Sequence, residues 1–169
     1  MKTLVIVDMQ NDFFDEAITL IDNPMYNCNH NVEYIIPVIQ GLVAHAIKLH
    51  WPIIFVEYTG FGKTMEEIYE LTESYRKQQT IPKNEPNGAP AILNTVQNKN
   101  WPLNIIVCGL YGNVCVSETV AGLLYLTNEI TISIITDAVW PDYCSRTKNG
   151  EEILIISDKI LRESSCAVK

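Results

Sequence analysis

Three residues far apart in the sequence have side chains that together are suited to nucleophilic catalysis. Cys115, in the segment GNVCVSETV, follows an apolar run and two glycines. Asp8 ends the apolar run TLVIVD, and Lys83 lies between two prolines in TIPKNEP. A thiol attacks a carbonyl carbon efficiently when a base takes its proton and a neighbouring cation stabilises the negative charge. A carboxylate and an ammonium group can supply these two functions.

Each of the three residues also has a purely structural interpretation. Most free cysteines pack as small hydrophobic residues. An aspartate at the end of a strand can cap the following loop, and Asp12, four residues further on, is expected to be such a cap or turn residue. A lysine in a loop is commonly solvated. Position alone leaves both interpretations of each residue open.

The residues around Cys115 favour a reactive site. Gly109 and Gly112 bracket a turn that lets the backbone approach a ligand closely. A helix that starts at residue 113 or 114 places Cys115 in its first turn, where the helix dipole and the free amides favour the thiolate. We therefore expect a lowered thiol pKa, and the same amides could form an oxyanion hole.

The elements that must position these residues are predicted from four continuous apolar runs, which are typical of parallel strands buried on both faces. The runs are TLVIVD (3–8), PIIFVEY (52–58), LNIIVCG (103–109) and ITISIITDA (130–138). Helical patterns cover 32–50, the stretch from 114 or 115 onward, and 146–161, and the tail SSCAVK is a candidate last strand. This alternation predicts a doubly wound α/β fold, in which ligands bind at the carboxyl ends of the strands.

The segment 63–98 is less regular. The charged stretch MEEIYELTESYRKQ (65–78) predicts a surface helix. The next stretch, with three prolines and one glycine, predicts an irregular loop that contains Lys83 and enters a helix near Pro90.

Composition limits the partners and the compartment. The net charge is −8 and no run of lysine or arginine occurs, so we expect no nucleic-acid partner and no anionic membrane partner. No apolar stretch approaches the roughly 20 residues of a membrane span, and no signal-peptide cleavage site follows the first apolar run. Five cysteines without a C-x-x-C pair indicate a reduced, cytoplasmic protein, although export by another route stays open.

Two further patterns are interpreted as non-functional. TGFGKT (59–64) ends like a phosphate-binding loop, but Glu57 occupies the position where that motif requires its first glycine. We interpret this segment as a flexible, glycine-bearing loop at the rim of a site. The three histidines lack metal-ligand spacing, so we predict no metal site.

Three segments together resemble the isochorismatase-like cysteine hydrolase superfamily, which includes nicotinamidases, N-carbamoylsarcosine amidase-like enzymes and isochorismatases. They are LVIVDMQNDFF with Asp8, IPK with Lys83, and CGLYGNVCVSETV with Cys115. The resemblance implies a three-layer α/β/α sandwich with a mostly parallel sheet of about six strands, forming one domain over residues 1–169. It also implies a catalytic triad of Asp8, Lys83 and Cys115, with an oxyanion hole made by the backbone amides of Tyr111 and Cys115.

The sequence departs from the nicotinamidase pattern after the second strand. The stretch EYTGFGKT contains no histidine, whereas nicotinamidases bind a metal there. Cys115 indicates the amide-cleaving branch, because isochorismatases that cleave an enol ether often lack the cysteine. We expect no cofactor. Relatives are commonly oligomers, and the apolar helix faces favour a homo-oligomer.

The resulting hypothesis is a cysteine hydrolase that cleaves a C–N bond of a small amide, imide or carbamoyl compound through a thioester. From their positions, Phe13, Tyr58, Asn113 and Trp140 are candidates for binding this small-molecule substrate. The alternatives are an isochorismatase-type vinyl ether hydrolase, a non-catalytic α/β module with a packed Cys115, and a thiol-redox protein.

Overall fold

The computed structural model describes residues 1–20 and 32–140 of the 169-residue chain. These residues contain a parallel five-stranded sheet in the order β3-β2-β1-β4-β5. The strands are β1 (Thr3–Val7), β2 (Ile53–Tyr58), β3 (Gln78–Lys83), β4 (Asn104–Leu110) and β5 (Thr131–Trp140). The predicted α/β fold with a parallel sheet of about six strands is confirmed. The strand predicted in SSCAVK and the helix predicted over 146–161 lie outside the described residues, and the extent of the single domain stays a prediction.

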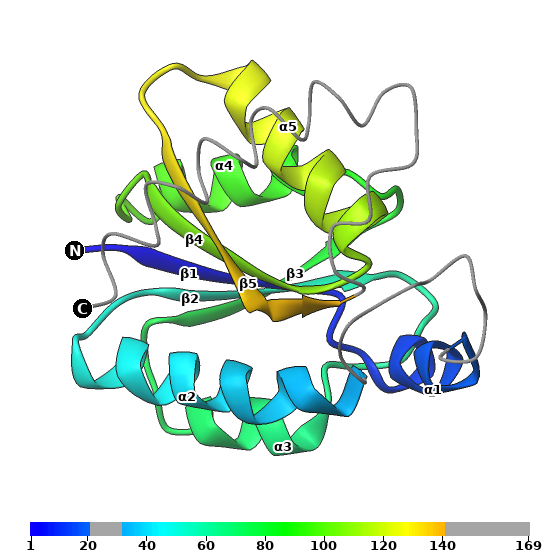
Figure 1. The fold of residues 1–169 in the computed structure, drawn as a ribbon. Coiled ribbons are helices and arrows are strands. Elements are labelled where there is room, and N and C mark those ends of the chain that lie inside the picture. Colours follow the sequence, from blue (N-terminus) through cyan, green and yellow to red (C-terminus); the bar gives the residue numbers. More distant parts are fainter. Residues whose placement is uncertain (21–31, 141–169) are drawn as a thin grey trace.

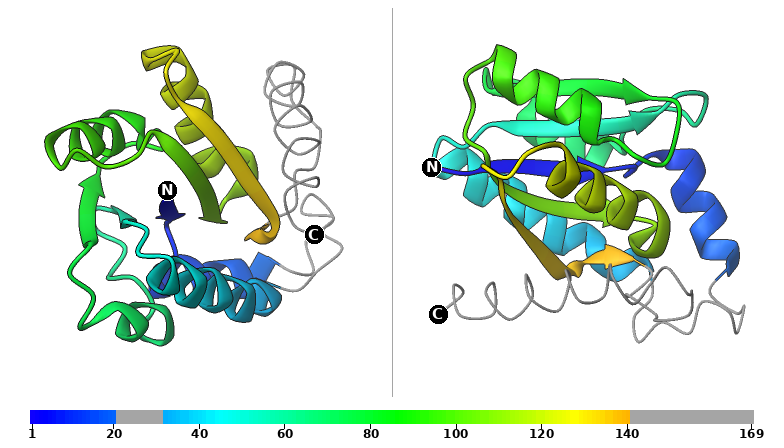
Figure 2. Two further views of the ribbon diagram at one scale, coloured as in Figure 1. Left: turned by 90° about the vertical axis from the view of Figure 1, so that its left-hand side faces the viewer. Right: turned by 90° about the horizontal axis from the view of Figure 1, so that it is seen from above.

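Helices cover both faces of the sheet (Figures 1 and 2). Helices α4 and α5 lie on one face, and α2 and α3 lie on the other, with α1 beside the carboxyl end of β1. The α-helices are α1 (Asn11–Leu20), α2 (Ile35–Lys48), α3 (Glu66–Tyr69), α4 (Ala89–Asn98) and α5 (Ser117–Leu126). Short 3₁₀ turns at Val32–Tyr34 and Glu70–Thr72 and a π-helical turn at Gly112–Val116 complete the described elements.

The continuous apolar runs in the strands follow from this three-layer arrangement. Successive side chains of a strand point to opposite faces, so a strand covered on both faces needs apolar residues throughout. In β1, Leu4 and Ile6 belong to the core cluster on the side of α2, while Val5 and Val7 belong to the cluster under α4 and α5.

The segment between β2 and α4 corrects the sequence-based prediction. The helix expected over 65–78 is limited to α3 and the adjoining 3₁₀ turn, and the expected irregular loop begins with strand β3. Every residue of β3 pairs with a residue of β2. Pro82, which has no N–H to donate, is tolerated because β3 is the edge strand of the described sheet. Lys83 therefore ends a strand and does not lie in a loop.

Gly109 is required where β4 approaches β1. Its φ of +131° disfavours any residue with a side chain, and a Cβ there would lie 2.0 Å from the carbonyl oxygen of Val7. This close approach lets the strand that leads to Cys115 lie directly against the strand that leads to Asp8.

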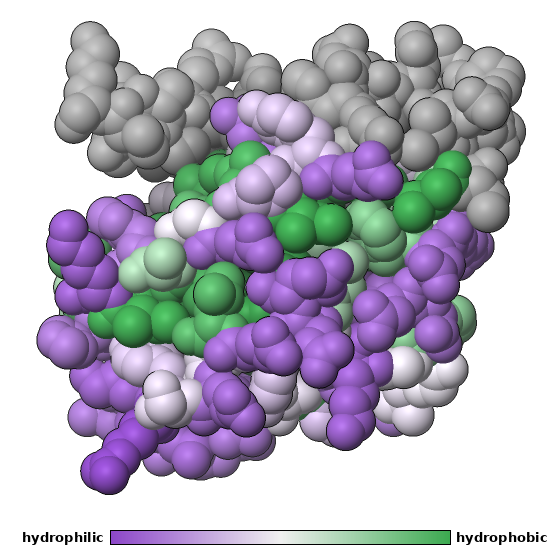
Figure 3. Space-filling model, turned by 90° about the horizontal axis from the view of Figure 1, so that it is seen from below, coloured by the Kyte–Doolittle hydropathy of each residue, from purple (hydrophilic) through white to green (hydrophobic). Residues whose placement is uncertain are grey.

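Figure 3 shows the face on which α2 lies, where hydrophobic residues form a band between hydrophilic side chains. Lys48, the last residue, is the only lysine, arginine, aspartate or glutamate of α2, which is otherwise IIPVIQGLVAHAI. This apolar surface is compatible with the expected homo-oligomer, which stays a prediction. None of the helices in the described part of the chain is long and apolar enough to cross a membrane.

Candidate active site

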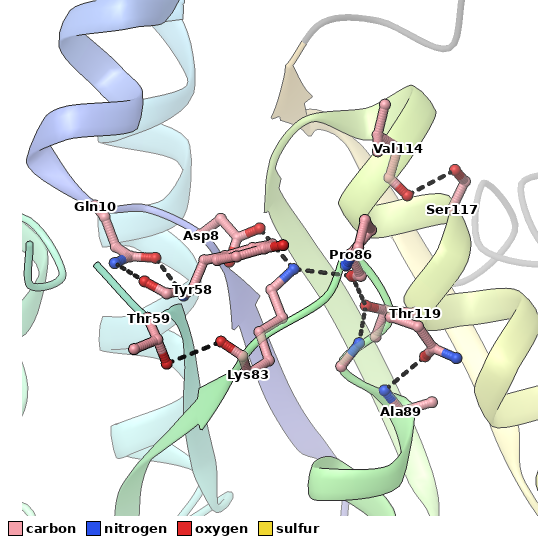
Figure 4. Close-up of polar contacts among 12 residues, drawn as sticks. Asp8, Gln10, Tyr58, Thr59, Lys83, Pro86, Ala89, Val114, Ser117 and Thr119 are labelled. Atoms are coloured by element: carbon pink, nitrogen blue, oxygen red, sulfur yellow. Dashed lines mark hydrogen bonds and ion pairs between the residues drawn. The ribbon is translucent and has the colours of Figure 1, made fainter. Parts of the chain in front are cut away.

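Asp8, Lys83 and Cys115 lie together at the carboxyl edge of the sheet. Asp8 directly follows β1, Lys83 is the last residue of β3, and Cys115 comes five residues after the end of β4. The Nζ atom of Lys83 lies 2.7 Å from Oδ2 of Asp8, and both side chains are buried (Figure 4). The thiol of Cys115 is in hydrogen-bonding contact with both groups. The fold thus brings together the three side chains selected from the sequence.

Lys83 has to reach across β2, because β2 lies between β1 and β3. Tyr58, the register partner of Lys83 on β2, lies beneath this path, with its ring centroid 5.2 Å from Nζ. Nζ also donates a hydrogen bond of 2.8 Å to the carbonyl oxygen of Pro86. The ammonium is therefore oriented by a carboxylate, a carbonyl and an aromatic face.

Asp8 lies in the left-handed region of the backbone map, with a φ of 53°. Aspartate tolerates this conformation better than most residues. Its backbone amide donates to the carbonyl oxygen of Val56, and its carbonyl accepts from the amide of Gln10. The backbone around the carboxylate is thus held by β2 on one side and by the start of α1 on the other.

The carboxylate of Asp8 is buried with few partners. No backbone amide or hydroxyl among the described residues donates to either of its oxygens, so Lys83 and the Cys115 thiol are the groups that stabilise its charge. Burial raises the pKa of Asp8 more than Lys83 and the thiol lower it. A raised pKa makes Asp8 a stronger proton acceptor than an exposed aspartate.

The predicted lowering of the Cys115 pKa is wrong for this site without substrate. Burial, followed by the charge and the hydrogen bond of Asp8, raises the pKa of Cys115 to about 12, and Lys83 only partly offsets this effect. The regular helix α5 begins at Ser117, so Cys115 lies in the preceding π-helical turn and not in the first turn of an α-helix. At neutral pH the site therefore holds a neutral thiol beside a carboxylate.

Tyr111 shapes the turn that carries Cys115. Its φ of 57° and ψ of 58° place it in the left-handed region between β4 and the π-helical turn. Its carbonyl oxygen accepts hydrogen bonds from the amides of Val114 and Val116, at 3.0 and 3.1 Å. The bond from Val116 spans five residues and defines the wider turn. The oxyanion-hole role of the Tyr111 and Cys115 amides stays a prediction.

Four aromatic residues, here named the aromatic cluster, adjoin this site: Phe13, Tyr58, Phe61 and Tyr111. Phe13 is the central ring. Its centroid lies 4.1 Å from Phe61 in a stacked arrangement, 5.2 Å from Tyr111 and 6.0 Å from Tyr58, the last two edge to face. Tyr58 links the cluster to Lys83. The cluster forms an apolar wall from α1, β2 and the turn that precedes Cys115.

The other two candidate substrate residues are placed differently. Asn113 is exposed in the π-helical turn, two residues before Cys115. Trp140, at the end of β5, is buried in the core cluster on the side of α2 and is 1% exposed. The substrate-binding roles of both residues stay predictions.

Sequence reasoning missed Gln10 and Phe61. The buried Gln10 side chain donates to the carbonyl oxygens of Tyr58 and Gly62 and accepts from the amide of Tyr58 at 2.6 Å. It thereby ties the 59–64 loop to the end of β1 and holds Phe61 over Phe13. The sequence held two signals for these residues: a glutamine two positions after Asp8, and an aromatic residue between two glycines. The loop lies at the rim of the site, as predicted.

The residues that the structure describes do not form an evident metal site. Among the described residues, no group of three histidine, cysteine, aspartate or glutamate side chains converges on one point. The predicted absence of a metal and a cofactor stays a prediction.

Two hollows adjoin the strand ends. The first has a volume of about 300 Å³ and is lined by Pro82, Lys83, Asn84, Glu85, Asn87, Pro90 and Ala91. The second has a volume of about 280 Å³ and is lined by Glu57, Lys63, Thr64, Tyr69 and Thr80.

The sequence matches the family model described as the isochorismatase domain over residues 2–153. It is also 30% identical to YaaI, an uncharacterized isochorismatase family protein of Bacillus subtilis (strain 168). This alignment spans 154 residues and covers 82% of this chain and 80% of YaaI. The chain therefore belongs to the isochorismatase family, and the predicted superfamily is confirmed.

Solved structures show the same fold at low sequence identity. A structure titled MAR1 ribonuclease, from Caenorhabditis elegans, aligns with a TM-score of 0.67 and 20% identity over 94% of this chain and 73% of that one. The nicotinamidase SaPncA of Staphylococcus aureus aligns with a TM-score of 0.65 and 18% identity over 94% of each chain. These likenesses concern the fold, and the different titles indicate that the fold does not select the substrate.

Proposed function

We propose that this hydrolase of the isochorismatase family cleaves a C–N bond of a small amide, imide or carbamoyl compound through a thioester on Cys115. The observation that carries the proposal is the buried ion pair between Lys83 and Asp8 in contact with the Cys115 thiol. Burying two charges is costly, so an ion pair with few other partners beside a nucleophile is better explained by catalysis than by stability.

The raised pKa values define the order of proton transfers. Because the thiol is neutral at rest, Asp8 has to accept its proton as the Cys115 sulfur attacks the carbonyl carbon. Protonated Asp8 then donates this proton to the leaving nitrogen, the C–N bond breaks, and an acyl thioester and a free amine or ammonia result. Asp8 next takes a proton from a water molecule that attacks the thioester and returns it to the departing sulfur. The neutral thiol and the Asp8 carboxylate are restored, and a carboxylic acid, or a carbamic acid from a carbamoyl compound, is released.

Lys83 acts on Asp8 and the thiolate in this scheme. Its charge keeps the buried Asp8 ionised before the attack and stabilises the sulfur while the proton is on Asp8. The amides of Tyr111 and Cys115 are proposed to donate to the developing oxyanion. The aromatic cluster would contact the apolar part of the substrate.

The test is hydrolysis of a panel of small amides, ureides and imides, with a vinyl ether included. Ammonia release reports on the primary amides and ureides, and chromatography of the ring-opened acid or of the carbonyl product reports on the imides and the vinyl ether. Wild type and Cys108→Ala serve as matched active proteins, and Cys115→Ala serves as the inactive one. We expect Cys115-dependent ammonia release and a Cys115 peptide that carries the acyl mass after rapid acid quenching. Equal ammonia release by Cys115→Ala and wild type would exclude the thioester mechanism.

The same panel tests the alternatives. Cleavage of the vinyl ether alone would identify the isochorismatase-type reaction, and no turnover of any compound would favour a non-catalytic module. A redox role is disfavoured for the described cysteines, because the Cys108 thiol is buried in β4 and directed at the Val5 carbonyl oxygen, 3.7 Å away.

A further inference from the structure

Thr119 is a buried polar residue to which the proposed mechanism gives no role. It lies on α5, four positions after Cys115, and is 0% exposed. Its hydroxyl oxygen accepts a hydrogen bond of 3.0 Å from the amide of Gly88 and donates one of 3.4 Å to the carbonyl oxygen of Pro86 (Figure 4). These partners are 31 and 33 positions away in the sequence. The Thr119 side chain therefore joins α5 to the 84–88 loop between β3 and α4.

The Pro86 carbonyl oxygen is an acceptor that Thr119 shares with the candidate active site. It also accepts a hydrogen bond of 2.8 Å from Nζ of Lys83, and the same Nζ lies 2.7 Å from Oδ2 of Asp8. A carbonyl oxygen has two lone pairs and can accept both bonds at once. A continuous chain of polar contacts therefore runs from the Thr119 hydroxyl to the carboxylate of Asp8.

The 84–88 loop also packs closely against α5 beside this hydroxyl. A Cβ on Gly122, three positions after Thr119, would lie 2.5 Å from Oδ1 of Asn87 and 2.8 Å from Cβ of Ala89. A Cβ on Gly88 would lie 3.3 Å from the Thr119 hydroxyl oxygen. Oδ1 of Asn87 accepts a hydrogen bond of 2.9 Å from the amide of Ala89, at the start of α4. The residues at 119 and 122 thus form the surface of α5 on which the loop rests.

The Lys83 ammonium depends on this loop because it is buried. An ammonium group that is removed from water needs acceptors for its N–H groups. If the Pro86 carbonyl moves, the flexible lysine side chain has to turn toward another acceptor, and its charge acts less on Asp8. Lys83, on β3, and the Cys115 thiol are the titratable groups that lower the pKa of Asp8.

We propose that Thr119 is a positioning residue for Lys83. Its hydroxyl and the close contact at Gly122 hold the Pro86 carbonyl in place. That carbonyl in turn directs the Lys83 ammonium toward Asp8. The inference rests on the proposed function for the reaction step that it supports, but the effect of Lys83 on Asp8 can be measured without turnover.

The first experiment follows the Asp8 carboxyl group by ¹³C NMR as a function of pH, with the signal assigned by its absence in Asp8→Asn. Thr119→Val keeps the shape of the side chain and removes the hydroxyl. We expect it to raise the pKa of Asp8 by about 0.5 or more, and we expect Thr119→Ser to retain the wild-type value. An Asp8 pKa that is unchanged or lowered in Thr119→Val would overturn the proposal.

Thr3→Val is the matched control for this titration. Thr3 is also 0% exposed, and its hydroxyl also donates to the carbonyl oxygen of a proline, Pro102, at 2.8 Å. It lies at the start of β1, at the amino edge of the sheet and away from the site. We expect Thr3→Val to leave the pKa of Asp8 unchanged. An equal rise in Thr3→Val and Thr119→Val would overturn the proposal, because any lost buried hydroxyl would then have the same effect.

Gly122→Ala displaces the loop without removing a hydroxyl, and it provides a test if Thr119→Val does not fold. Gly41→Ala is its control, because a Cβ on Gly41 of α2 would have no heavy atom within 4 Å. We expect the pKa of Asp8 to rise in Gly122→Ala and not in Gly41→Ala. An unchanged pKa in Gly122→Ala would overturn the claim that the position of the loop governs Lys83.

The second experiment uses turnover of an amide that the wild-type protein hydrolyses. Lys83 acts on the reacting groups and not on substrate binding, so Thr119→Val should lower kcat about tenfold and keep KM within about twofold. Thr119→Ser should keep kcat within about threefold of wild type. A change confined to KM would overturn the positioning role. A raised Asp8 pKa in Thr119→Val without hydrolysis of any amide by wild type would support the positioning role and contradict the amidase function.

Discussion

Two cysteines seven positions apart, Cys108 and Cys115, are both buried, and yet their surroundings differ in kind. Cys108 lies within β4, where burial alone raises its pKa and its sulfur faces the Val5 carbonyl oxygen. Cys115 lies in the turn after the same strand, in contact with Asp8 and Lys83. Burial makes both thiols poor acids, but only Cys115 has a base that can take its proton. The proposed nucleophile therefore differs from Cys108 in its ionisable neighbours and not in a low pKa at rest.

The strongest test of this comparison exchanges each cysteine for alanine. We expect Cys115→Ala to lower kcat/KM at least about 10³-fold, because Cys115 is the one thiol of residues 1–20 and 32–140 that contacts Asp8 and Lys83. Cys108→Ala should keep kcat/KM within about threefold and lose about 1 kcal/mol of unfolding free energy through the small cavity it leaves. Steady-state kinetics and urea unfolding measure both. A loss of activity in Cys108→Ala with unchanged stability would contradict the inference that Cys108 has only a packing role.

Asp8→Asn removes the base and keeps the shape of the side chain. We expect kcat/KM to fall about 10³-fold, since general-base catalysis is lost. The pKa of Asp8 is raised in the folded protein, so its contribution to stability is complete at low pH and is lost as the pH rises through that folded-state pKa. Asparagine does not ionise, so the unfolding free energy of the Asp8→Asn protein does not decrease with pH for this reason.

The stability of the Asp8→Asn protein, measured relative to wild type by urea unfolding, should therefore increase as the pH rises above about 3.8, the ordinary pKa of aspartate, and level off above the raised folded-state pKa. A difference that falls over this range would show that Lys83 stabilises ionised Asp8 more than burial penalises it. The catalytic assignment would then need another explanation for the ion pair.

Lys83→Met tests the second neighbour of Cys115. The charge of Lys83 lowers the pKa of Asp8, so its removal should raise that pKa further. Asp8 then becomes a base only at higher pH, and the acid limb of the profile of kcat/KM against pH should shift upward. We expect about a 10²-fold loss at pH 7. An unchanged acid limb would show that the charge of Lys83 does not influence the pKa of Asp8.

The smallest effect concerns the resting reactivity of the two thiols. With its pKa raised to about 12, Cys115 should react with iodoacetamide at pH 7 at least about tenfold more slowly than free cysteine. Cys108, which is fully buried, should react only after unfolding. Mass spectrometry of tryptic peptides gives both rates. Fast alkylation of Cys115 would indicate a preformed thiolate and contradict the order of steps proposed above.

The sequence was informative wherever structure depends on neighbouring residues. The four apolar runs, α2 and the helix after Cys115 were predicted because buried parallel strands and amphipathic helices impose a pattern on contiguous residues. Strand β3 was missed because QQTIPK is largely polar and contains a proline, which only an edge position tolerates. Phe61 was missed because its contact with Phe13 depends on how Gln10 holds the 59–64 loop.

The sequence by itself determined the parallel α/β sheet and, from the positions of Asp8 and Cys115 at strand ends, the edge at which the site lies. The tertiary structure alone decided that Lys83 reaches across β2 to Asp8, that Thr119 shares the Pro86 carbonyl oxygen with Lys83, and that the Cys115 pKa is raised. The physical reason is that strand order, burial and desolvation arise from contacts between segments distant in the chain. No local pattern of residues encodes these quantities.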